Sequence, residues 1–508
     1  MFNKPLTKKV FNTDWERREW ISKTPNIPLF EKLSVIRQYL LDKYYGSEDK
    51  PEFSQYPFRV FNIDIETEIS GEFPDQFKTQ YAINVISIYN TLENEVVVWC
   101  YKSDATTLMT KERQKEIIEA VKKDYDASPK FIINAYDDET PLLEDFLQYW
   151  IGNYPDVVTG WNTKGFDIPY IVNRLKTVLG ETNMKKLSPV WDKLKTPIFE
   201  KFDKKNNMTT YMIQGISLID YLPLYKKFAG TSKQSFKLDA IAKEELDLGK
   251  FDYYDIGYES MEEFQKKDFT TFVQYNMIDT VLVRLIDKKL GFINLMRNIC
   301  NISLCEYEAI YQSIPHILGA LTVQARNNGV KFLTDANKDK DRQHQEEEDD
   351  YGYQGAFVFP TKAGYYNNGI MSFDFNSLYP NVMMTVNISP DTKVGKLLND
   401  NWKDIVKNIR EKKEVETLGK IMLRKTNGKN IEITVDQLKD LIENKCTVSA
   451  NGVLYIKPAL KFGIIPQFLD KMYKRRVEVK GEMKQNKKKA KAIDEEIKKL
   501  EAELKKMK

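Results

Sequence analysis

The sequence is poor in the two residue types that most often bind transition metals in proteins. Its 508 residues contain four cysteines and two histidines, His316 and His344. The cysteines form no C-x-x-C pair, which argues against a zinc cluster or a disulfide framework and is typical of a reducing compartment. Any bound metal ion must therefore depend on carboxylates, which favour hard ions such as Mg²⁺ or Mn²⁺.

Long apolar runs are also missing. No run reaches the roughly 18 residues that a membrane span needs, and the first 15 residues lack the apolar core of a signal peptide. The hydrophobic content of 42% is that of a globular protein, and the length predicts two to four domains. We therefore expect a cytoplasmic protein without a membrane partner.

The net charge of +3 conceals an uneven distribution. Residues 471–508 carry 15 Lys and Arg against 7 Asp and Glu, so the rest of the chain is acidic on balance. A basic C-terminal stretch suggests a partner that bears phosphates. Alternating strand-like and helical patterns between residues 59 and 160 predict a mixed sheet with helices on its faces, an α/β fold. Residues 395–450 read as two lysine-rich helical segments around a turn at 426–430.

Acidic residues recur in strand and helix patterns of the N-terminal half. Asp64 and Glu66 alternate with apolar residues on one strand, so both point to the same side. Read alone, the pair fits an edge strand with a solvated face. Asp167 follows a glycine-bearing loop at the start of a helix, and Tyr275 and Asp279 share one helix face at i and i+4.

Together and in this order, these five residues resemble the three exonuclease motifs of family B DNA polymerases and of the DEDD nucleases that carry a tyrosine. The resemblance implies an RNase H-like 3′→5′ exonuclease domain, with two Mg²⁺ or Mn²⁺ ions held by the four carboxylates and a water oriented by Tyr275. Lys250 is either the counterpart of a family lysine or an exposed loop lysine. Phe166 is either a core residue, which we prefer, or a platform for an unpaired base.

The sequence SFDFNSLYP, from Ser372 to Pro380, places an aspartate on an apolar strand before a Tyr-Pro turn. It resembles motif A of the same family. The resemblance implies that Asp374 and the Phe375 carbonyl bind two further ions. It also implies that the Ser377 and Leu378 backbone N–H groups hold the incoming dNTP, and that Tyr379 excludes ribonucleotides.

Downstream, Arg476 and Lys480 lie at i and i+4 of a basic helix that resembles the first finger helix of the phage enzymes. The resemblance implies contacts with the β- and γ-phosphates of the dNTP; the plain alternative is a solvated basic helix. Over its whole length the sequence most resembles the replicative polymerases of T-even-like bacteriophages. This resemblance would place the protein in the cytoplasm of the host cell.

Two family signatures do not occur in these 508 residues: the Asn-Ser-x-Tyr-Gly of the second finger helix and the Asp-Thr-Asp of the second palm strand. One carboxylate alone cannot hold two ions in register for nucleotidyl transfer. Ile493, Ile497, Leu500, Leu504 and Met507 step by 4, 3, 4 and 3, a seam suited to a second helix.

We therefore expect the N-terminal subunit of a split polymerase. Its partners would be primer–template DNA, dNTPs, a second polypeptide with the missing motifs and, through that polypeptide, a sliding clamp. The expected parts are an N-terminal domain (1–58 and 292–345), the exonuclease domain (59–291), a partial palm (346–455) and partial fingers (456–508). One alternative is a free-standing exonuclease whose polymerase remnant binds DNA, and another is a structural subunit with degraded catalysis.

Overall fold

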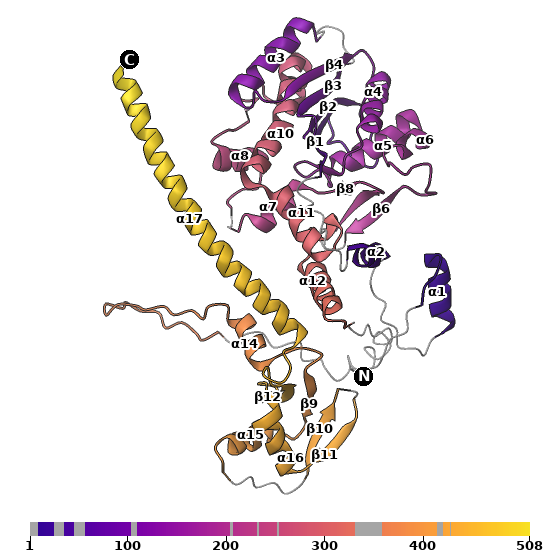
Figure 1. Cartoon of the computed structure of the whole chain (residues 1–508). Helices are drawn as coiled ribbons and strands as arrows, with labels where there is room; N and C mark the ends of the chain where they lie inside the picture. The colour runs from indigo at the N-terminus through magenta and orange to yellow at the C-terminus, as the bar shows by residue number, and fades with distance from the viewer. Residues whose placement is uncertain are drawn as a thin grey trace. The chain divides into compact units, whose positions relative to one another are not determined.

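The computed structural model divides the chain into two compact units, one of residues 47–319 and one of residues 1–46 with 320–508. It describes residues 9–24, 35–44, 56–102, 109–203, 207–230, 233–250, 253–330, 358–413, 420–426 and 428–507. Among these described residues, no helix is both long enough and apolar enough to cross a membrane. Figure 1 shows the elements of both units.

A six-stranded mixed sheet forms the centre of the unit 47–319, in the order β4-β3-β2-β1-β5-β8. Strands β1, β2 and β3 pair antiparallel, whereas β3–β4, β1–β5 and β5–β8 pair parallel. The bounds of the strands are β1 Val60–Thr67, β2 Ile83–Asn90, β3 Glu95–Tyr101, β4 Lys130–Tyr136, β5 Val157–Thr159 and β8 Ser217–Leu218. The mixed sheet expected from the alternation in the sequence is confirmed.

Helices cover both faces of this sheet (Figure 1). One apolar core lies beneath α3, α7, α8, α10 and α11, and the other beneath α4, α5 and α6. The helices are α3 Lys111–Asp124, α4 Glu139–Gly152, α5 Asp167–Leu179, α6 Glu181–Lys185, α7 Tyr221–Phe228, α8 Leu238–Leu246, α9 Met261–Lys267, α10 Phe269–Leu290, α11 Phe292–Ser303 and the 3₁₀ helix η2 Tyr307–Tyr311. A separate hairpin joins β6 Ile198–Asp203 to β7 Met208–Ile213.

The strict alternation of β1 is visible in its packing. Phe61, Ile63 and Ile65 are buried in the core under α4 and α5. The intervening residues Asp64 and Glu66 therefore face the side covered by α10, because successive side chains of a strand point to opposite faces. This arrangement places two acidic side chains on a sheet face that a helix covers.

The second unit contains a smaller sheet in the order β11-β10-β9-β13-β12. Its strands are β9 Lys393–Leu397, β10 Ile421–Lys425, β11 Asn430–Ile433, β12 Cys446–Val448 and β13 Val453–Ile456. Its helices are α1 Asp14–Lys23, α2 Val35–Tyr44, α14 Leu378–Val386, α15 Trp402–Arg410, α16 Val435–Asp440, the π-helical turn η3 Leu441–Lys445 and α17 Ile464–Met507, while α12 Ser313–Asn327 crosses the boundary between the units.

The helical interpretation of residues 395–450 was wrong in part. The turn at 426–430 connects the antiparallel strands β10 and β11 rather than two helices. Leu397, Leu423 and Leu454 of this sheet join Ile405 and Ile409 of α15 in a small core of their own. In β10 the buried Ile421 and Leu423 alternate with the less buried Met422 and the exposed Arg424, which is the period of a half-buried strand.

Candidate active site

Two acidic side chains of β1 meet one of α10. Carboxylate oxygens of Asp64, Glu66 and Asp279 all lie within 4.8 Å of one another, and Asp279 is only 6% exposed. Among the described residues, this is the one group of three or more acidic, His or Cys side chains placed closely enough to hold a metal ion. The sequence spacing placed Asp64 and Glu66 on one face, and the packing of α10 on β1 supplies the third carboxylate.

Asp167 also contacts β1. It is the first residue of α5, and its Oδ1 accepts the Ile65 backbone N–H at 3.1 Å, between the two acidic residues of β1. The preceding loop passes close to β1 at Gly160, where an added Cβ would come within 2.4 Å of the Ile63 carbonyl oxygen. Only glycine fits that approach, so the loop sequence determines where Asp167 begins its helix.

Lys250 lies inside this cluster, so the exposed-lysine interpretation was wrong. Its side chain is 18% exposed and forms an ion pair with Asp279 Oδ2. The ammonium also donates to the Tyr275 hydroxyl at 3.3 Å and lies 4.7 Å from the centre of that ring. Lys250 therefore links the tyrosine to the carboxylates and brings a positive charge into an acidic site.

The sequence analysis missed two further residues of this region. Asn276, whose side chain is fully buried, donates from Nδ2 to Asp64 Oδ2 at 2.6 Å. Asp220 caps α7 and also accepts the backbone N–H groups of Asn162 and Lys164, at 3.1 and 3.2 Å, in the loop before Asp167. Asn276 directly follows Tyr275 in the chain, and Asp220 directly precedes a helix, so both could have been noticed in the sequence. Neither position indicates which distant residue the side chain contacts.

The four carboxylates are strongly destabilised in their charged form. Burial, and then the nearby charges of Asp279, Asp167 and Glu66, raise the pKa of Asp64 well above its ordinary value. Burial and Asp279 raise the pKa of Glu66 to about 8, and burial raises that of Asp167 to about 7 although the Ile65 N–H opposes the shift. The pKa of Asp279 is also raised by burial, against the opposing effect of Lys250.

This donor set fits divalent ions. All of its ligand atoms are carboxylate oxygens, the ligands that Mg²⁺ and Mn²⁺ prefer. Oδ1 of Asp279 is buried and has no hydrogen-bond partner within the described part of the chain. An unsatisfied buried carboxylate oxygen is costly, and a cation at this point would offset both that cost and the mutual repulsion.

Phe166 lies at the edge of the site. Its ring is partly buried against the core under α5 and lies tilted against the ring of Tyr170, with centroids 5.4 Å apart. The ring of Phe73, which is 84% exposed, lies 5.9 Å away on the solvent side. The preferred core interpretation of Phe166 therefore agrees with its packing.

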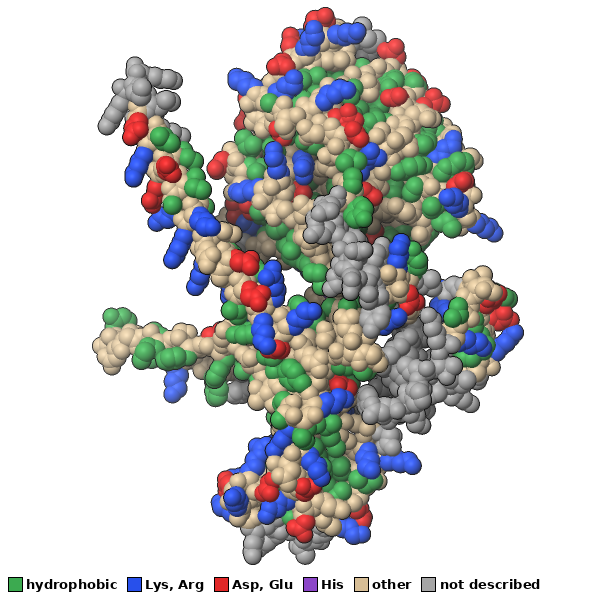
Figure 2. Space-filling model, viewed as in Figure 1, with side chains coloured by type: hydrophobic (Ala, Val, Ile, Leu, Met, Phe, Trp, Pro, Cys, Tyr) green, Lys and Arg blue, Asp and Glu red, His purple; other side chains and the backbone are tan. Residues whose placement is uncertain are grey.

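The motif A residues lie in a different environment. Residues 358–377 contain no assigned strand, and the neighbours of Asp374, Phe373 and Phe375, are 89% and 77% exposed. The strand expected around Asp374 is therefore not observed. Figure 2 shows hydrophobic side chains along this extended segment, which Figure 1 draws in orange ahead of α14.

The structure brings Ser377 and Arg476 of this unit together. Helix α14 packs against α17, and Arg476 Nη1 donates to Ser377 Oγ at 3.2 Å. Asn376 Nδ2 donates to the Tyr473 hydroxyl of the same helix at 3.3 Å. Lys480 follows one helical turn beyond Arg476 on the exposed α17, and Tyr379 is 76% exposed near the start of α14.

Ser377 is held in the left-handed region, with φ of 52°, directly before α14 begins at Leu378. Few residues other than glycine adopt this conformation, and it turns the chain sharply from the extended segment into the helix. A hollow of about 220 Å³ opens beside this turn and is lined by Phe375, Asn376 and Leu378, among others.

Two family models match this chain. The family model of the exonuclease domain of DNA polymerase family B matches residues 19–241, and that of DNA polymerase family B matches residues 313–500. The chain is similar to the DNA-directed DNA polymerase of Enterobacteria phage T4, with 30% identity over 78% of this chain and 42% of the phage protein.

Similarity to the DNA-directed DNA polymerase of Escherichia phage RB69 is 27% over 95% of this chain and 48% of that protein. Similarity to the DNA polymerase delta catalytic subunit of Drosophila melanogaster is 24% over 70% of this chain and 30% of that subunit. The chain thus spans about half the length of the phage relatives that it matches.

Proposed function

This chain belongs to DNA polymerase family B, and from that premise we propose that it removes nucleotides from the 3′ end of a DNA strand. The observation that carries the proposal is the meeting of Asp64, Glu66 and Asp279, with oxygens within 4.8 Å of one another and one buried oxygen of Asp279 lacking a partner within the described residues. The family uses divalent metal ions, and this donor set is suited to them.

In this proposal Asp64, Glu66, Asp167 and Asp279 hold two Mg²⁺ or Mn²⁺ ions. Bound ions of this kind activate a water and stabilise the leaving 3′-oxygen of a phosphodiester. The protein's part is to fix the ligands. Asn276 orients Asp64 through one carboxylate oxygen, which leaves the other oxygen for an ion.

Tyr275 would orient the attacking water, and Lys250 would hold the tyrosine. The hydrogen bond from the ammonium fixes the position of the phenol oxygen beside Asp279. Burial, followed by the charge of Asp279, raises the pKa of Tyr275 above its ordinary value, so the hydroxyl keeps its proton and can donate it in a hydrogen bond to the water.

We further propose that residues 346–508 form half of a nucleotidyl-transfer site. Asp374 and the Phe375 carbonyl would bind ions, the N–H groups of Ser377 and Leu378 and the side chains of Arg476 and Lys480 would bind the triphosphate, and Tyr379 would select deoxyribonucleotides. The hydrogen bond between Arg476 and Ser377 supports this proposal, because it places a cation beside the turn that follows Asp374.

Completion of that second site requires another carboxylate. The 508 residues contain no Asp-Thr-Asp, and none of the described residues forms a three-member acidic group with Asp374. We propose that a second polypeptide supplies the missing motifs, the rest of the palm and the contact with a sliding clamp. Primer–template DNA and dNTPs would be the substrates, in the cytoplasm of a host cell as the phage relatives suggest.

The test is a 5′-labelled primer–template incubated with the purified chain and Mg²⁺, with and without dNTPs. Wild-type protein is expected to shorten the primer from its 3′ end, and Asp64→Ala is expected to abolish shortening. Failure of the folded wild-type chain to degrade DNA with either Mg²⁺ or Mn²⁺ would overturn the proposal of exonuclease activity.

The same reactions separate the two proposals for the second unit. Extension that appears only when a polypeptide carrying the missing motifs is added supports the split polymerase. If that addition yields no extension while shortening persists, the exposed Asp374 favours the alternative, a free-standing exonuclease whose second unit serves DNA binding.

A further inference from the structure

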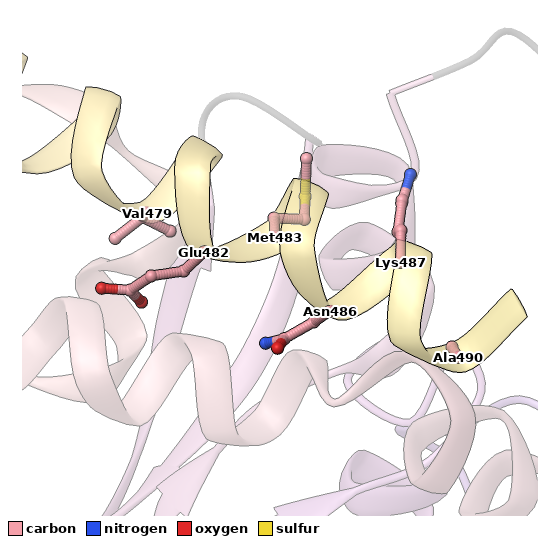
Figure 3. Close-up of a pocket in the computed structure, with 6 residues that line it drawn as sticks. All are labelled: Val479, Glu482, Met483, Asn486, Lys487 and Ala490. Atoms are coloured by element: carbon pink, nitrogen blue, oxygen red, sulfur yellow. The ribbon is translucent and has the colours of Figure 1, made fainter. Parts of the chain in front are cut away.

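Helix α17 carries a groove of about 430 Å³ (Figure 3). Val479, Met483 and Ala490 are among the residues that line it. They continue, at the same helical spacing, the apolar seam of residues 493–507 that the sequence predicts to pack on a second helix. The lining therefore fits this predicted helix contact, and we assign no separate site to the groove.

The four carboxylates of the candidate active site differ in how their side chains are held. Asp64, Asp167 and Asp279 each accept a hydrogen bond from a side chain or from the backbone. Within the described part of the chain, no group hydrogen-bonds the carboxylate of Glu66. The direction of this carboxylate therefore depends, more than that of the other three, on the backbone of β1 that carries it.

Strand β1 becomes irregular on both edges near Glu66. On one edge, β5 pairs with β1 from Val60 to Asn62 and not further along the described strand. On the other edge, the pairing with β2 shifts register between Glu66 and Thr67, where Asn84 is an extra residue on β2. A candidate metal ligand thus lies where the sheet itself provides little support for the backbone.

Gln265 of α9 takes the place of a partner strand at this point. Its Nε2 donates to the Thr67 carbonyl at 2.8 Å, and its Oε1 accepts the Ile69 N–H at 3.1 Å. These two hydrogen bonds have the pattern that a residue of a neighbouring parallel strand would form. Gln265 is only 6% exposed and Thr67 only 3%, so loss of the amide would leave the Thr67 carbonyl unpaired away from water.

Helix α9 is itself anchored beside the site. Phe264, the neighbour of Gln265, is fully buried, and its ring lies edge-on to that of Tyr275 with centroids 6.3 Å apart. Ser260 caps the helix by accepting the Glu263 N–H at 3.1 Å. The helix therefore holds the Gln265 amide in a fixed position against the end of β1.

We propose that Gln265 is a positioning residue of the exonuclease site. It holds the end of β1 and so directs the Glu66 carboxylate toward Asp64 and Asp279. The inference rests on the proposed function of this site, and it assigns to Gln265 an effect on metal binding that passes through the backbone. Hydrogen bonds that hold a metal ligand from outside typically change metal affinity about ten- to a hundredfold.

The first test is calorimetric titration of the full chain with Mn²⁺ in the absence of DNA. Binding that disappears in Asp64→Ala belongs to this site. Gln265→Met keeps the length of the side chain but removes the amide, and should weaken this binding about tenfold. Gln114→Met is the matched control, because Gln114 also donates to a backbone carbonyl, that of Met109. It should leave Mn²⁺ binding unchanged.

The second test is hydrogen exchange at the Ile69 amide, which separates positioning of the metal site from a purely structural role. Gln265→Met should speed this exchange, because the amide loses its acceptor. Saturating Mn²⁺ should slow it again in the same variant, because coupling between metal binding and the end of β1 acts in both directions. A purely structural contact would give fast exchange that does not respond to Mn²⁺.

Equal Mn²⁺ affinity in Gln265→Met and wild type would overturn this inference alone, and so would Ile69 exchange that does not respond to Mn²⁺. Gln265→Asn, with the amide on a shorter side chain, covers the case in which Gln265→Met does not fold, and should also weaken Mn²⁺ binding. A folded wild-type chain that binds no Mn²⁺ at the site would overturn the proposed function together with the inference. The two failures are therefore distinguishable.

Discussion

The two candidate catalytic regions of this chain differ in how completely the chain itself builds them. Around Asp64 the ligands come from β1, α5 and α10, and buried neighbours orient them. Around Asp374 the backbone is extended and the adjacent aromatic rings are exposed, while the next residues, Asn376 and Ser377, bond to Tyr473 and Arg476 of α17. A sequence motif therefore forms a complete site only where other elements pack over it, because these elements supply the partner residues and exclude water.

The largest expected effect is on primer shortening, and it distinguishes the region around Asp279 from the region around Asp374. Asp279→Ala should reduce the rate of primer shortening by at least about a thousandfold. The substitution removes one of the carboxylates that would hold the two metal ions, and the reaction needs both ions. Asp374→Ala should leave shortening unchanged within about twofold. The measurement is single-turnover degradation of a labelled single strand. Loss of shortening in Asp374→Ala would show that the two regions are not independent.

Lys250→Met should lower the rate of shortening about ten- to a hundredfold. The substitution keeps the apolar stem but removes the cation that contacts Asp279 and Tyr275. Lys266→Met is a matched control, since Lys266 pairs with Glu262 on the exposed face of α9. Equal rates in Lys250→Met and wild type would remove Lys250 from the proposed site.

Asn276→Ala should have a smaller effect, about tenfold on the rate. It leaves Asp64 in place but removes the hydrogen bond that orients its carboxylate. Because that bond acts through a ligand, calorimetric titration with Mn²⁺ should also show weaker binding. A change in thermal stability without any change in Mn²⁺ affinity would indicate a purely structural role.

Divalent ions should stabilise the unit that contains β1 and not the region around Asp374. Mg²⁺ at about a hundred times its dissociation constant is expected to add about 2.7 kcal/mol, or several degrees in the unfolding midpoint. Scanning calorimetry of wild type with Mg²⁺ and with EDTA measures the shift. Asp64→Asn should reduce it, whereas Asp374→Asn should preserve it; an equal loss in both would contradict the comparison.

The smallest effect concerns the exposed segment. Phe373→Ser should lower the binding of a hydrophobic dye by the chain, since the ring it removes is 89% exposed. The unfolding midpoint should stay unchanged, because an exposed ring contributes little to folding. The buried Phe272→Ser is the contrasting variant and should lower the midpoint strongly.

The local elements around the acidic cluster and the identity of its carboxylates could be predicted from the sequence. Alternation along β1 follows from the two-residue period of a strand, so the common direction of Asp64 and Glu66 could be predicted without a structure. The pairing of Tyr275 and Asp279 on one helix face follows equally from the period of α10. These properties depend on neighbours in the chain, which the sequence states directly.

Tertiary packing determines which distant groups complete the site. The contact of Lys250 with Asp279, of Asn276 with Asp64 and of Asp220 with the loop before Asp167 joins residues whose spacing carries no signal. The same reason explains the error at Asp374, where an apolar sequence predicted a strand. Burial is a property of the packing around a segment, and the described residues place none over this one.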